Sequence, residues 1–340
     1  MNGASQPRSG AAQSALTGPT SSTSDTPKAH SAGSAARLLS GGGAMRPGHS
    51  RTLPGTCREP KHFSARCAMP RPRTTDDRMT ALLSIWAWVE IALVTLGGFV
   101  VQTVLFVVCL PFDRRRAVAG RAFRLVGVVA ARLNPFWRFG VVGPVPSPPP
   151  RRTVVVSNHE SNADPFLISF LPWEMKWLGK ASLFRIPVAG WMMWMAGDVP
   201  VRRGESDSAK QAMAACARWL ARGMPVMLFP EGTRSKDGQL LPFKDGAFRL
   251  AIETGAEILP LAVAGTGTAL PKHSWKFGRA EGRVTLGAPI ATTGLTLAEV
   301  EPLKARVRAE IETLRARLAA SATPGAGANA GARSVGTRTG

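Results

Sequence analysis

A stretch of 22 residues without a charged side chain, residues 91–112, limits the folds that this chain can adopt. At about 1.5 Å per residue, a helix of that length reaches across the hydrocarbon core of a bilayer, which is about 30 Å thick. Trp86 and Trp88 stand just before the stretch, and such rings favour a membrane interface. Residues 91–112 are therefore predicted to form a transmembrane helix, with a helix buried in a protein core as the alternative.

The residues around this stretch give a mixed signal about its orientation. Arg114, Arg115 and Arg116 follow it closely, which favours a cytoplasmic C-terminal end, but basic residues also precede it. We expect the protein at the inner membrane of the cell, with the domain that follows the helix on the cytoplasmic side.

Composition divides the rest of the chain into tails and a body. Residues 1–78 are rich in Ser, Gly, Ala, Pro and Arg, lack a secretory signal pattern and are predicted to be a disordered basic tail. Translation from Met79 is the alternative, because ordered character begins directly after it. Residues 79–138 are then a membrane anchor and juxtamembrane segment, residues 139–320 form one domain, and the Gly/Ala-rich residues 321–340 form a second disordered tail.

The formal net charge of the chain is +21, of which residues 1–78 contribute +7 and residues 321–340 contribute +2. The remaining +12 indicates an anionic partner, which could be nucleic acid, a phospholipid surface or a phosphorylated substrate. Zinc-finger spacing and aromatic RNA-binding strings are absent from the sequence, so no nucleic acid partner is expected. No two of the four cysteines have metal-ligand spacing, and no metal site is expected.

From residue 139 onward, short apolar runs alternate with helical patterns. The apolar runs predict buried strands, and Ser206 or Asp207 can cap the first of the helices. This alternation predicts an α/β domain in which helices cover a mostly parallel sheet. The predicted strands are residues 153–156, 225–229 and 258–264, and the predicted helices are residues 206–223 and 243–254.

A further helix is predicted near the C-terminus. Thr296 and Glu299 have the spacing of a capping box, and apolar residues then recur at helical spacing, although Pro302 interrupts the pattern early. A helix packed against the domain is expected, with a partner-binding helix as the alternative. The apolar residues are Leu303, Val307, Ile311, Leu314 and Leu318.

Residues 158–166, with the sequence Asn-His-Glu-Ser-Asn-Ala-Asp-Pro-Phe, come just after a predicted strand. Ligands of α/β proteins gather at the C-terminal ends of strands. Asp164 lies five residues after His159, so its carboxylate can orient the imidazole as a general base. The other histidine within residues 139–320 is His273.

Three other interpretations of this segment compete with a histidine base. Ser157 or Ser161 could be a nucleophile, but neither stands in a Gly-x-Ser-x-Gly elbow. A metal site built from His159, Glu160 and Asp164 lacks a second His or Cys nearby. The third interpretation is a structural contact between the histidine and the aspartate.

Residues 229–235, with the sequence Phe-Pro-Glu-Gly-Thr-Arg-Ser, form a turn after another predicted strand. Gly232 lets the backbone approach a ligand, Thr233 supplies a hydroxyl, and Arg234 offers a planar fork that matches phosphate oxygens. Glu231 could hold Arg234 or contact a substrate hydroxyl. This turn predicts a phosphate site, and an ordinary turn with a salt bridge is the alternative.

Further cations occur between the two motifs. Arg202 and Arg203 end the segment 197–203, and Lys180 ends the segment 178–180. Each could contact a substrate or be a solvated surface charge.

These motifs, together with Ile-Leu-Pro-Leu-Ala-Val at residues 258–263, resemble those of the glycerophospholipid acyltransferases, most closely the bacterial 1-acyl-sn-glycerol-3-phosphate acyltransferases. The resemblance covers residues 150–290. It implies transfer of an acyl chain from acyl-CoA or acyl-carrier protein to lysophosphatidic acid, which gives phosphatidic acid without a cofactor. Membrane phospholipid is then a further partner.

The resemblance also implies roles for individual residues. His159 is expected to be the general base and Asp164 the carboxylate that orients it. Residues 231–234 are expected to hold the phosphate and glycerol of the acceptor, and Arg203 to make another phosphate contact. Pro260 matches a fourth motif, for which acyl-chain packing is the expected role.

The segment 197–203, which matches the second of four family motifs in chain order, departs from the family pattern. Val199-Pro200 stand where an aromatic–aliphatic pair is usual, and Arg202 stands at an often acidic or polar position. Alternatives are therefore an acyltransferase for glycerol-3-phosphate, another lysophospholipid or a lyso-aminolipid, and a non-catalytic lipid-binding homologue. The apolar residues 184–195 are expected to form part of an acyl tunnel, a membrane-facing lip or the core.

Overall fold

The computed structural model describes residues 75–322, apart from residues 236, 272 and 273. The disordered tails predicted at both ends lie almost entirely outside these residues, and so does His273.

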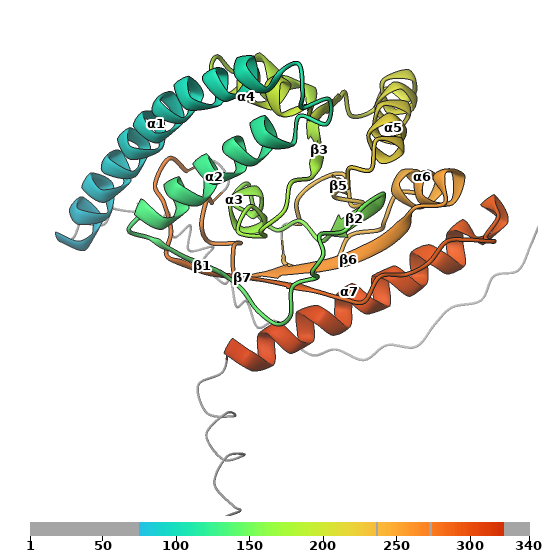
Figure 1. Ribbon diagram of the computed structural model, residues 1–340. Coiled ribbons are helices and arrows are strands. Elements are labelled where there is room, and N and C mark those ends of the chain that lie inside the picture. The colour runs from blue at the N-terminus through green and yellow to red at the C-terminus, as the bar shows by residue number, and fades with distance from the viewer. Residues whose placement is uncertain (1–74, 236, 272–273, 323–340) are drawn as a thin grey trace, which may run out of the picture. The chain divides into compact units, whose positions relative to one another are not determined.

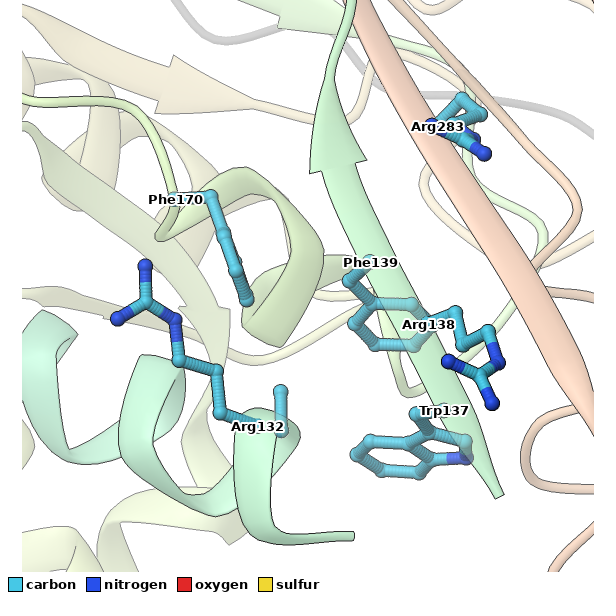
Figure 2. Close-up of a pocket in the computed structure, with 7 residues that line it drawn as sticks. Arg132, Trp137, Arg138, Phe139, Phe170 and Arg283 are labelled. Carbon is cyan, nitrogen blue, oxygen red and sulfur yellow. The ribbon is translucent and has the colours of Figure 1, made fainter. Parts of the chain in front are cut away.

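Seven strands form one sheet: β1 (Trp137–Val141), β2 (Thr153–Ser157), β3 (Lys176–Lys180), β4 (Val199–Val201), β5 (Val226–Leu228), β6 (Glu257–Ala264) and β7 (Ala280–Leu286). Their order across the sheet is β1-β7-β6-β2-β5-β3-β4 (Figure 1). The pair β6–β7 is antiparallel and the other five pairs are parallel, which confirms the predicted α/β fold. At the free edge, the β1 rings of Trp137 and Phe139 stack with centroids 5.1 Å apart (Figure 2).

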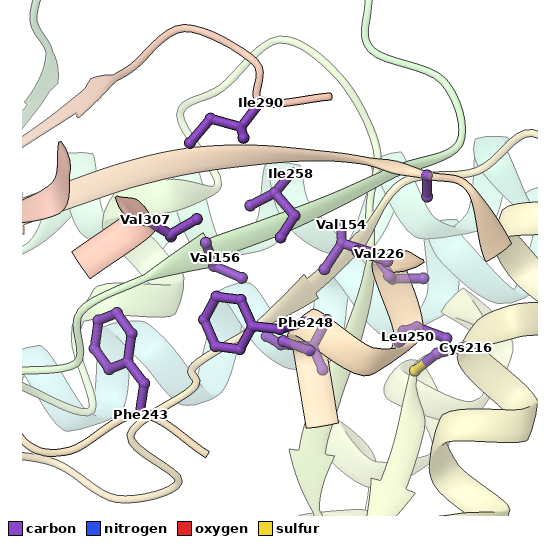
Figure 3. Close-up of a cluster of buried hydrophobic side chains, with 14 of the residues drawn as sticks. Val154, Val156, Cys216, Val226, Phe243, Phe248, Leu250, Ile258, Ile290 and Val307 are labelled. Carbon is purple, nitrogen blue, oxygen red and sulfur yellow. The ribbon is translucent and has the colours of Figure 1, made fainter. Parts of the chain in front are cut away.

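Helices cover both faces of this sheet (Figure 1). Val154 and Val156 of β2 pack among residues of α5, α6 and α7 (Figure 3), whereas Val155 packs with Leu167 of α3 on the opposite face. Because successive side chains of a strand point to opposite faces, β2 is buried on both sides and appears in the sequence as a continuous apolar run. The helices are α1 (Thr75–Cys109), α2 (Ala117–Leu133), α3 (Asp164–Ile168), α4 (Ala189–Ala196), α5 (Ser206–Ala221), α6 (Gly246–Thr254) and α7 (Val300–Ala322).

The two helices predicted between the strands are present, but the cap of the first and the start of the second differ from the prediction. Helix α5 begins at Ser206, but the residue before it, Glu205, is the N-cap and no side chain caps the helix, so the predicted cap is wrong. Helix α6 begins at Gly246 instead of residue 243. Phe243 precedes the helix and stacks in the core on Phe248, with ring centroids 6.2 Å apart.

The C-terminal helix α7 packs against the domain, as predicted. Thr296 and Glu299 form the capping box around a short 3-10 turn, η2 (Leu297–Glu299), and α7 follows. Pro302 lies in the first turn of α7, where a backbone N–H has no partner within the helix, so the helix continues through it. All five predicted apolar residues are buried: Leu303, Val307, Ile311, Leu314 and Leu318.

Helix α1 is long and apolar enough to cross a membrane, judged by its length and composition. It contains most of the predicted span 91–112 and ends at Cys109. One side of α1 packs against α2 and α4, where the Gln102 side-chain amide donates to the Met192 carbonyl at 2.9 Å. Most of its other apolar side chains are exposed, which makes α1 a candidate membrane-spanning helix.

The apolar stretch 184–195 contributes both to the core and to the surface. Met192 is buried, whereas Trp191 and Trp194 are 55% and 58% exposed. Phe106 of α1 packs edge-on against Trp194 with centroids 5.7 Å apart. The exposed side of α4 is therefore continuous with α1, as a membrane-facing lip would be.

Candidate active site

The C-terminal end of β2 carries the first motif. The Asn158 side chain donates to the Val263 carbonyl and accepts from the Val263 amide, both at 2.9 Å, which ties this end of β2 to β6. His159 follows at the edge where the parallel strands end. Its ring stacks on Phe229, which follows β5, with centroids 4.0 Å apart. Both neighbouring strands therefore fix the position of the histidine.

Asp164 is the first residue of α3 and is fully buried. Its Oδ2 atom lies 2.8 Å from Nδ1 of His159 and accepts the backbone N–H groups of Glu160 and Ser161 at 2.8 and 3.0 Å. The Thr266 hydroxyl, which no motif marked, donates to Oδ1. An ionised carboxylate is only an acceptor, so it assigns the ring proton to Nδ1 and leaves Nε2 free to take a proton.

Glu231 binds the backbone of the site instead of Arg234. Its Oε1 atom accepts the His159 N–H at 2.9 Å, and its Oε2 atom accepts the Leu241 N–H at 3.1 Å. Burial raises the pKa of Glu231, and these two hydrogen bonds oppose the rise. The structure thus gives Glu231 a role in positioning His159, which differs from both contacts expected from the sequence.

An arginine corner, formed by Arg203 and Arg234, lies beside the Gly232 turn. Gly232 has a φ of +68°, and Arg234 is half-buried after the exposed Thr233. Strands β4 and β5 are both parallel to β3, so the residues that follow them, Arg203 and Arg234, come from the same edge of the sheet. Burial lowers the pKa of Arg203, and the positive charge of Arg234 lowers it further. Within the described residues, neither pairs with a carboxylate. Such a corner suits a phosphate.

Three other cations near this edge have different surroundings. Lys180 is the exposed last residue of β3. Arg202 pairs with Glu205 at 2.9 Å on the surface, so it is engaged outside the corner. Lys244, which the motifs did not mark, lies so close to Gly232 that a Cβ there would be 2.8 Å from Cε and 2.9 Å from Nζ.

Helix α7 supports the site from outside the predicted motifs. The Arg308 guanidinium donates to the carbonyls of Leu240 and Leu241 at 2.9 and 2.8 Å. Farther along the helix, Arg315 lies 3.4 Å from the carboxylate of Glu160. Because the Leu241 amide binds the carboxylate that holds the histidine backbone, α7 stabilises the segment on which that contact depends.

Comparison with known proteins identifies the family. Residues 138–264 match the family model described as Acyltransferase. The 1-acyl-sn-glycerol-3-phosphate acyltransferase of Haemophilus influenzae is 32% identical over 188 residues, which are 53% of this chain and 77% of that protein. The chain belongs to the 1-acyl-sn-glycerol-3-phosphate acyltransferase family.

Other relatives in this acyltransferase family match over a smaller share of their length. The protein from Chlamydomonas reinhardtii is 34% identical over 203 residues, which are 59% of this chain and 60% of that one. The chain likewise covers 60% of the human alpha enzyme, at 34% identity over 169 residues, 49% of this chain. The crystal structure of the 1-acyl-sn-glycerophosphate acyltransferase from Thermotoga maritima is similar with a TM-score of 0.59 at 26% identity. The structural match covers 73% of this chain and 99% of the Thermotoga maritima chain.

Replacing Gly232 with alanine is expected to destabilise this acyltransferase family member. The left-handed conformation costs an L-residue about 1–2 kcal/mol, and the new Cβ would also displace Lys244. Gly294→Ala is the matched control, since Gly294 has a φ of +82° with nothing within 4 Å of its added Cβ. Urea denaturation should show a larger loss for Gly232→Ala. An equal loss would mean that the contact with Lys244 has no energetic effect.

Glu160 is expected to make the stability of this acyltransferase family member depend on pH near neutrality. Burial and the negative charge of Asp164 raise the pKa of Glu160 to about 7, against the opposing charge of Arg315 and with a small added rise from Glu231. The pKa of an unfolded glutamate is about 4.3. The folded protein therefore binds more protons between these values, and its stability falls as the pH rises from about 4.3 to about 7.

Glu160→Gln should remove this contribution. The free energy of unfolding of the variant should fall less between about pH 5 and about pH 7.5 than that of the wild type, as followed by urea denaturation. Burial also raises the pKa of Glu174 to about 7, but Glu174 is present in both proteins and does not affect the comparison. Parallel pH profiles would contradict the prediction.

Proposed function

We propose that this protein is an O-acyltransferase that moves an acyl chain from a thioester to the free hydroxyl of 1-acyl-sn-glycerol-3-phosphate and so makes phosphatidic acid. The observation that carries the proposal is His159, oriented by the buried Asp164, on the same sheet edge as the arginine corner. The names of the relatives support this acceptor.

In the proposed step, Nε2 of His159 accepts the proton of the acceptor hydroxyl while the hydroxyl oxygen attacks the thioester carbonyl carbon. The C–O ester bond forms, the C–S bond breaks, and the thiolate leaves with the bonding electron pair. The imidazolium, which Asp164 stabilises, then gives its proton to the sulfur. Holding both substrates in one geometry lowers the barrier, and the step requires no cofactor.

The arginine corner is proposed to bind the acceptor phosphate, with Thr233 and Lys180 as further contacts. The donor is acyl-CoA or acyl-carrier protein. Because the acceptor and the product are membrane lipids, α1 is proposed to anchor the domain where they reside, on the cytoplasmic side of the inner membrane.

Arg234→Gln is expected to raise the KM for lysophosphatidic acid by about 10-fold to 100-fold, because a hydrogen bond to a charged group contributes about 1.5–3 kcal/mol. The value of kcat should change little if the phosphate binds equally in the ground and transition states. Arg202→Gln is the matched control, since Arg202 pairs with Glu205 on the surface. An unchanged KM in Arg234→Gln would remove this residue from the acceptor site.

The proposed function is tested by offering the detergent-solubilised protein a labelled acyl-CoA or acyl-carrier protein with different acceptors. Formation of phosphatidic acid from lysophosphatidic acid is the expected result. Acylation of glycerol-3-phosphate or lysophosphatidylcholine in its place would assign the protein to a sister activity. Binding to lipid vesicles without acylation of any acceptor would favour a non-catalytic lipid-binding protein.

A further inference from the structure

A second set of arginines lies at the β1 edge of the sheet, on the side away from the arginine corner. An open cavity of about 280 Å³ at the free edge of β1 is lined by Arg132, Arg138 and Arg283 (Figure 2). We call it the edge cavity. Its other main lining is aromatic, from Trp137, Phe139 and Phe170.

The sheet register places the edge cavity on the same edge as His159. Since β7 runs antiparallel to β6, the starts of β7 and β1 lie where β2 ends. Ser157 of β2 pairs with Leu261, and Arg283 pairs with Ala264, three residues farther along β6. Strand β1 is three strand spacings from β2, which is about 14 Å. A flexible ligand anchored at the cavity can therefore reach the histidine.

Helix α3 connects the cavity with the proposed base. It starts at Asp164, and the ring of Phe166 packs edge-on against Trp137 with centroids 5.4 Å apart. Phe170 follows α3 and lines the cavity, where the Arg132 guanidinium lies 5.6 Å from its ring centroid. The cavity and the His159 site thus lie on either side of one short helix.

The charge of the edge cavity is not neutralised within the part of the chain that the structure describes. None of its three guanidinium groups pairs with a carboxylate there. Glu281 stands opposite Arg138 in the strand register but forms no ion pair with it. Phe139 and Phe170 are half-buried and line the cavity, where Phe139 also stacks on Trp137 and the Arg132 guanidinium lies over the ring of Phe170. Guanidinium groups without a carboxylate partner beside aromatic rings match a ligand that carries both phosphates and a planar aromatic group.

We propose that the edge cavity binds the nucleotide end of a coenzyme A thioester, which makes acyl-CoA the donor. The adenine ring packs on Phe170 beside Arg132, and the phosphates extend over the free edge of β1 toward Arg138 and Arg283, which lie on the other side of the strand (Figure 2). This inference rests on the proposed function.

The strand order agrees with it. The arginine corner follows β4 and β5 on one side of β2, and the edge cavity lies at β1 and β7 on the other. His159 is therefore between two phosphate sites, as a reaction between two phosphorylated substrates requires.

Two other ligands share part of this chemistry. A phospholipid headgroup offers the phosphate but no planar ring for Phe139 and Phe170. The phosphopantetheine of an acyl-carrier protein offers a phosphate without adenine. The observations therefore favour the nucleotide, and the experiment separates all three.

The test compares the full-length, detergent-solubilised triple variant R132Q/R138Q/R283Q with the control R151Q/R306Q/R317Q. The control removes the same charge from exposed arginines outside the cavity. The KM for acyl-CoA should rise at least about tenfold in the triple variant, and calorimetric binding of adenosine 3′,5′-bisphosphate should weaken in proportion. The KM for lysophosphatidic acid should not change. Phe170→Leu should weaken binding of the bisphosphate more than binding of inorganic pyrophosphate.

The outcomes distinguish this inference from the proposed function. Equal KM values for acyl-CoA in the triple variant and the control would overturn the inference, even if both make phosphatidic acid. So would a triple variant that loses binding to phosphatidylglycerol vesicles but keeps its KM for acyl-CoA, because the ligand would then be a lipid headgroup. Phosphatidic acid formed from acyl-carrier protein but not from acyl-CoA would overturn the inference and sustain the proposed function. No product from either donor would count against the proposed function itself.

Discussion

Replacing His159 with alanine is expected to lower the rate of phosphatidic acid formation by about 10²-fold to 10⁴-fold, the contribution of a positioned general base. The Nδ1 atom is held by Asp164 at 2.8 Å, so Nε2 is the atom that can take the proton of the acceptor hydroxyl. The arginine corner is untouched, and the KM for lysophosphatidic acid should therefore change little. Initial rates with a labelled acyl-CoA measure both quantities.

His273→Ala is the matched control, as the other histidine of residues 139–320. It should retain the wild-type rate, and thermal unfolding should show that His159→Ala is folded. Asp164→Asn should also lose most activity, because the amide no longer stabilises the imidazolium. A folded His159→Ala variant within about tenfold of the wild-type rate would exclude His159 as the base, because the loss would fall below the lower end of the expected range.

The contact between His159 and Asp164 could be predicted from the sequence because both residues lie in one segment after one strand. The contacts of Glu231 and Thr266 could not. Glu231 reaches the His159 amide because β5 is the neighbour of β2 on one side, and Thr266 reaches Asp164 because β6 is the neighbour on the other. Strand order follows from packing between distant segments, which spacing along the chain does not encode.

The strands of the sheet also divide into those that the sequence predicts and those that it does not. The three predicted strands, β2, β5 and β6, are central, and burial on both faces gives them continuous apolar runs. The strands that had not been predicted lack this signal. Exposed and buried residues alternate at the start of β7, β4 has three residues with Pro200 in the middle, and β3 begins with Lys176.

Lys176 belongs to a group of four buried ionisable side chains, of which only Glu174 and Lys176 are close in the sequence. Arg124 of α2 pairs with Asp198, which follows α4, and lies 3.7 Å from Glu174. The Lys176 ammonium lies 3.2 Å from Glu174 and donates to the Ala196 carbonyl at 2.7 Å. Two basic and two acidic side chains thus lie together between α2, β3 and α4. In the sequence, nothing distinguishes any of these four residues from an ordinary charged residue exposed to solvent.

Asp198→Ala is expected to lower the free energy of unfolding by about 3–5 kcal/mol, because it leaves Arg124 as a buried charge without its nearest partner. The Trp177 amide also loses its acceptor, which lies at 3.0 Å. Asp207→Ala is the matched control. Asp207 and its partner Lys210 are exposed, and a surface pair contributes about 0–1 kcal/mol. Chemical denaturation in detergent should separate the two variants clearly, and equal losses would show that the buried pair is not stabilising.

The double variant Arg124→Met/Asp198→Leu tests the physical reason for this loss. Removing both members of a buried pair leaves no uncompensated charge between them, so the double variant should be more stable than Asp198→Ala alone. If it is equally unstable, the loss comes from the Trp177 hydrogen bond and not from the isolated guanidinium.

Because Asp198 directly precedes β4, whose C-terminal end leads to Arg203, the Asp198→Ala variant should also raise the KM for lysophosphatidic acid. Recovery of stability without recovery of this KM would show that Asp198 positions the arginine corner in addition to stabilising the fold.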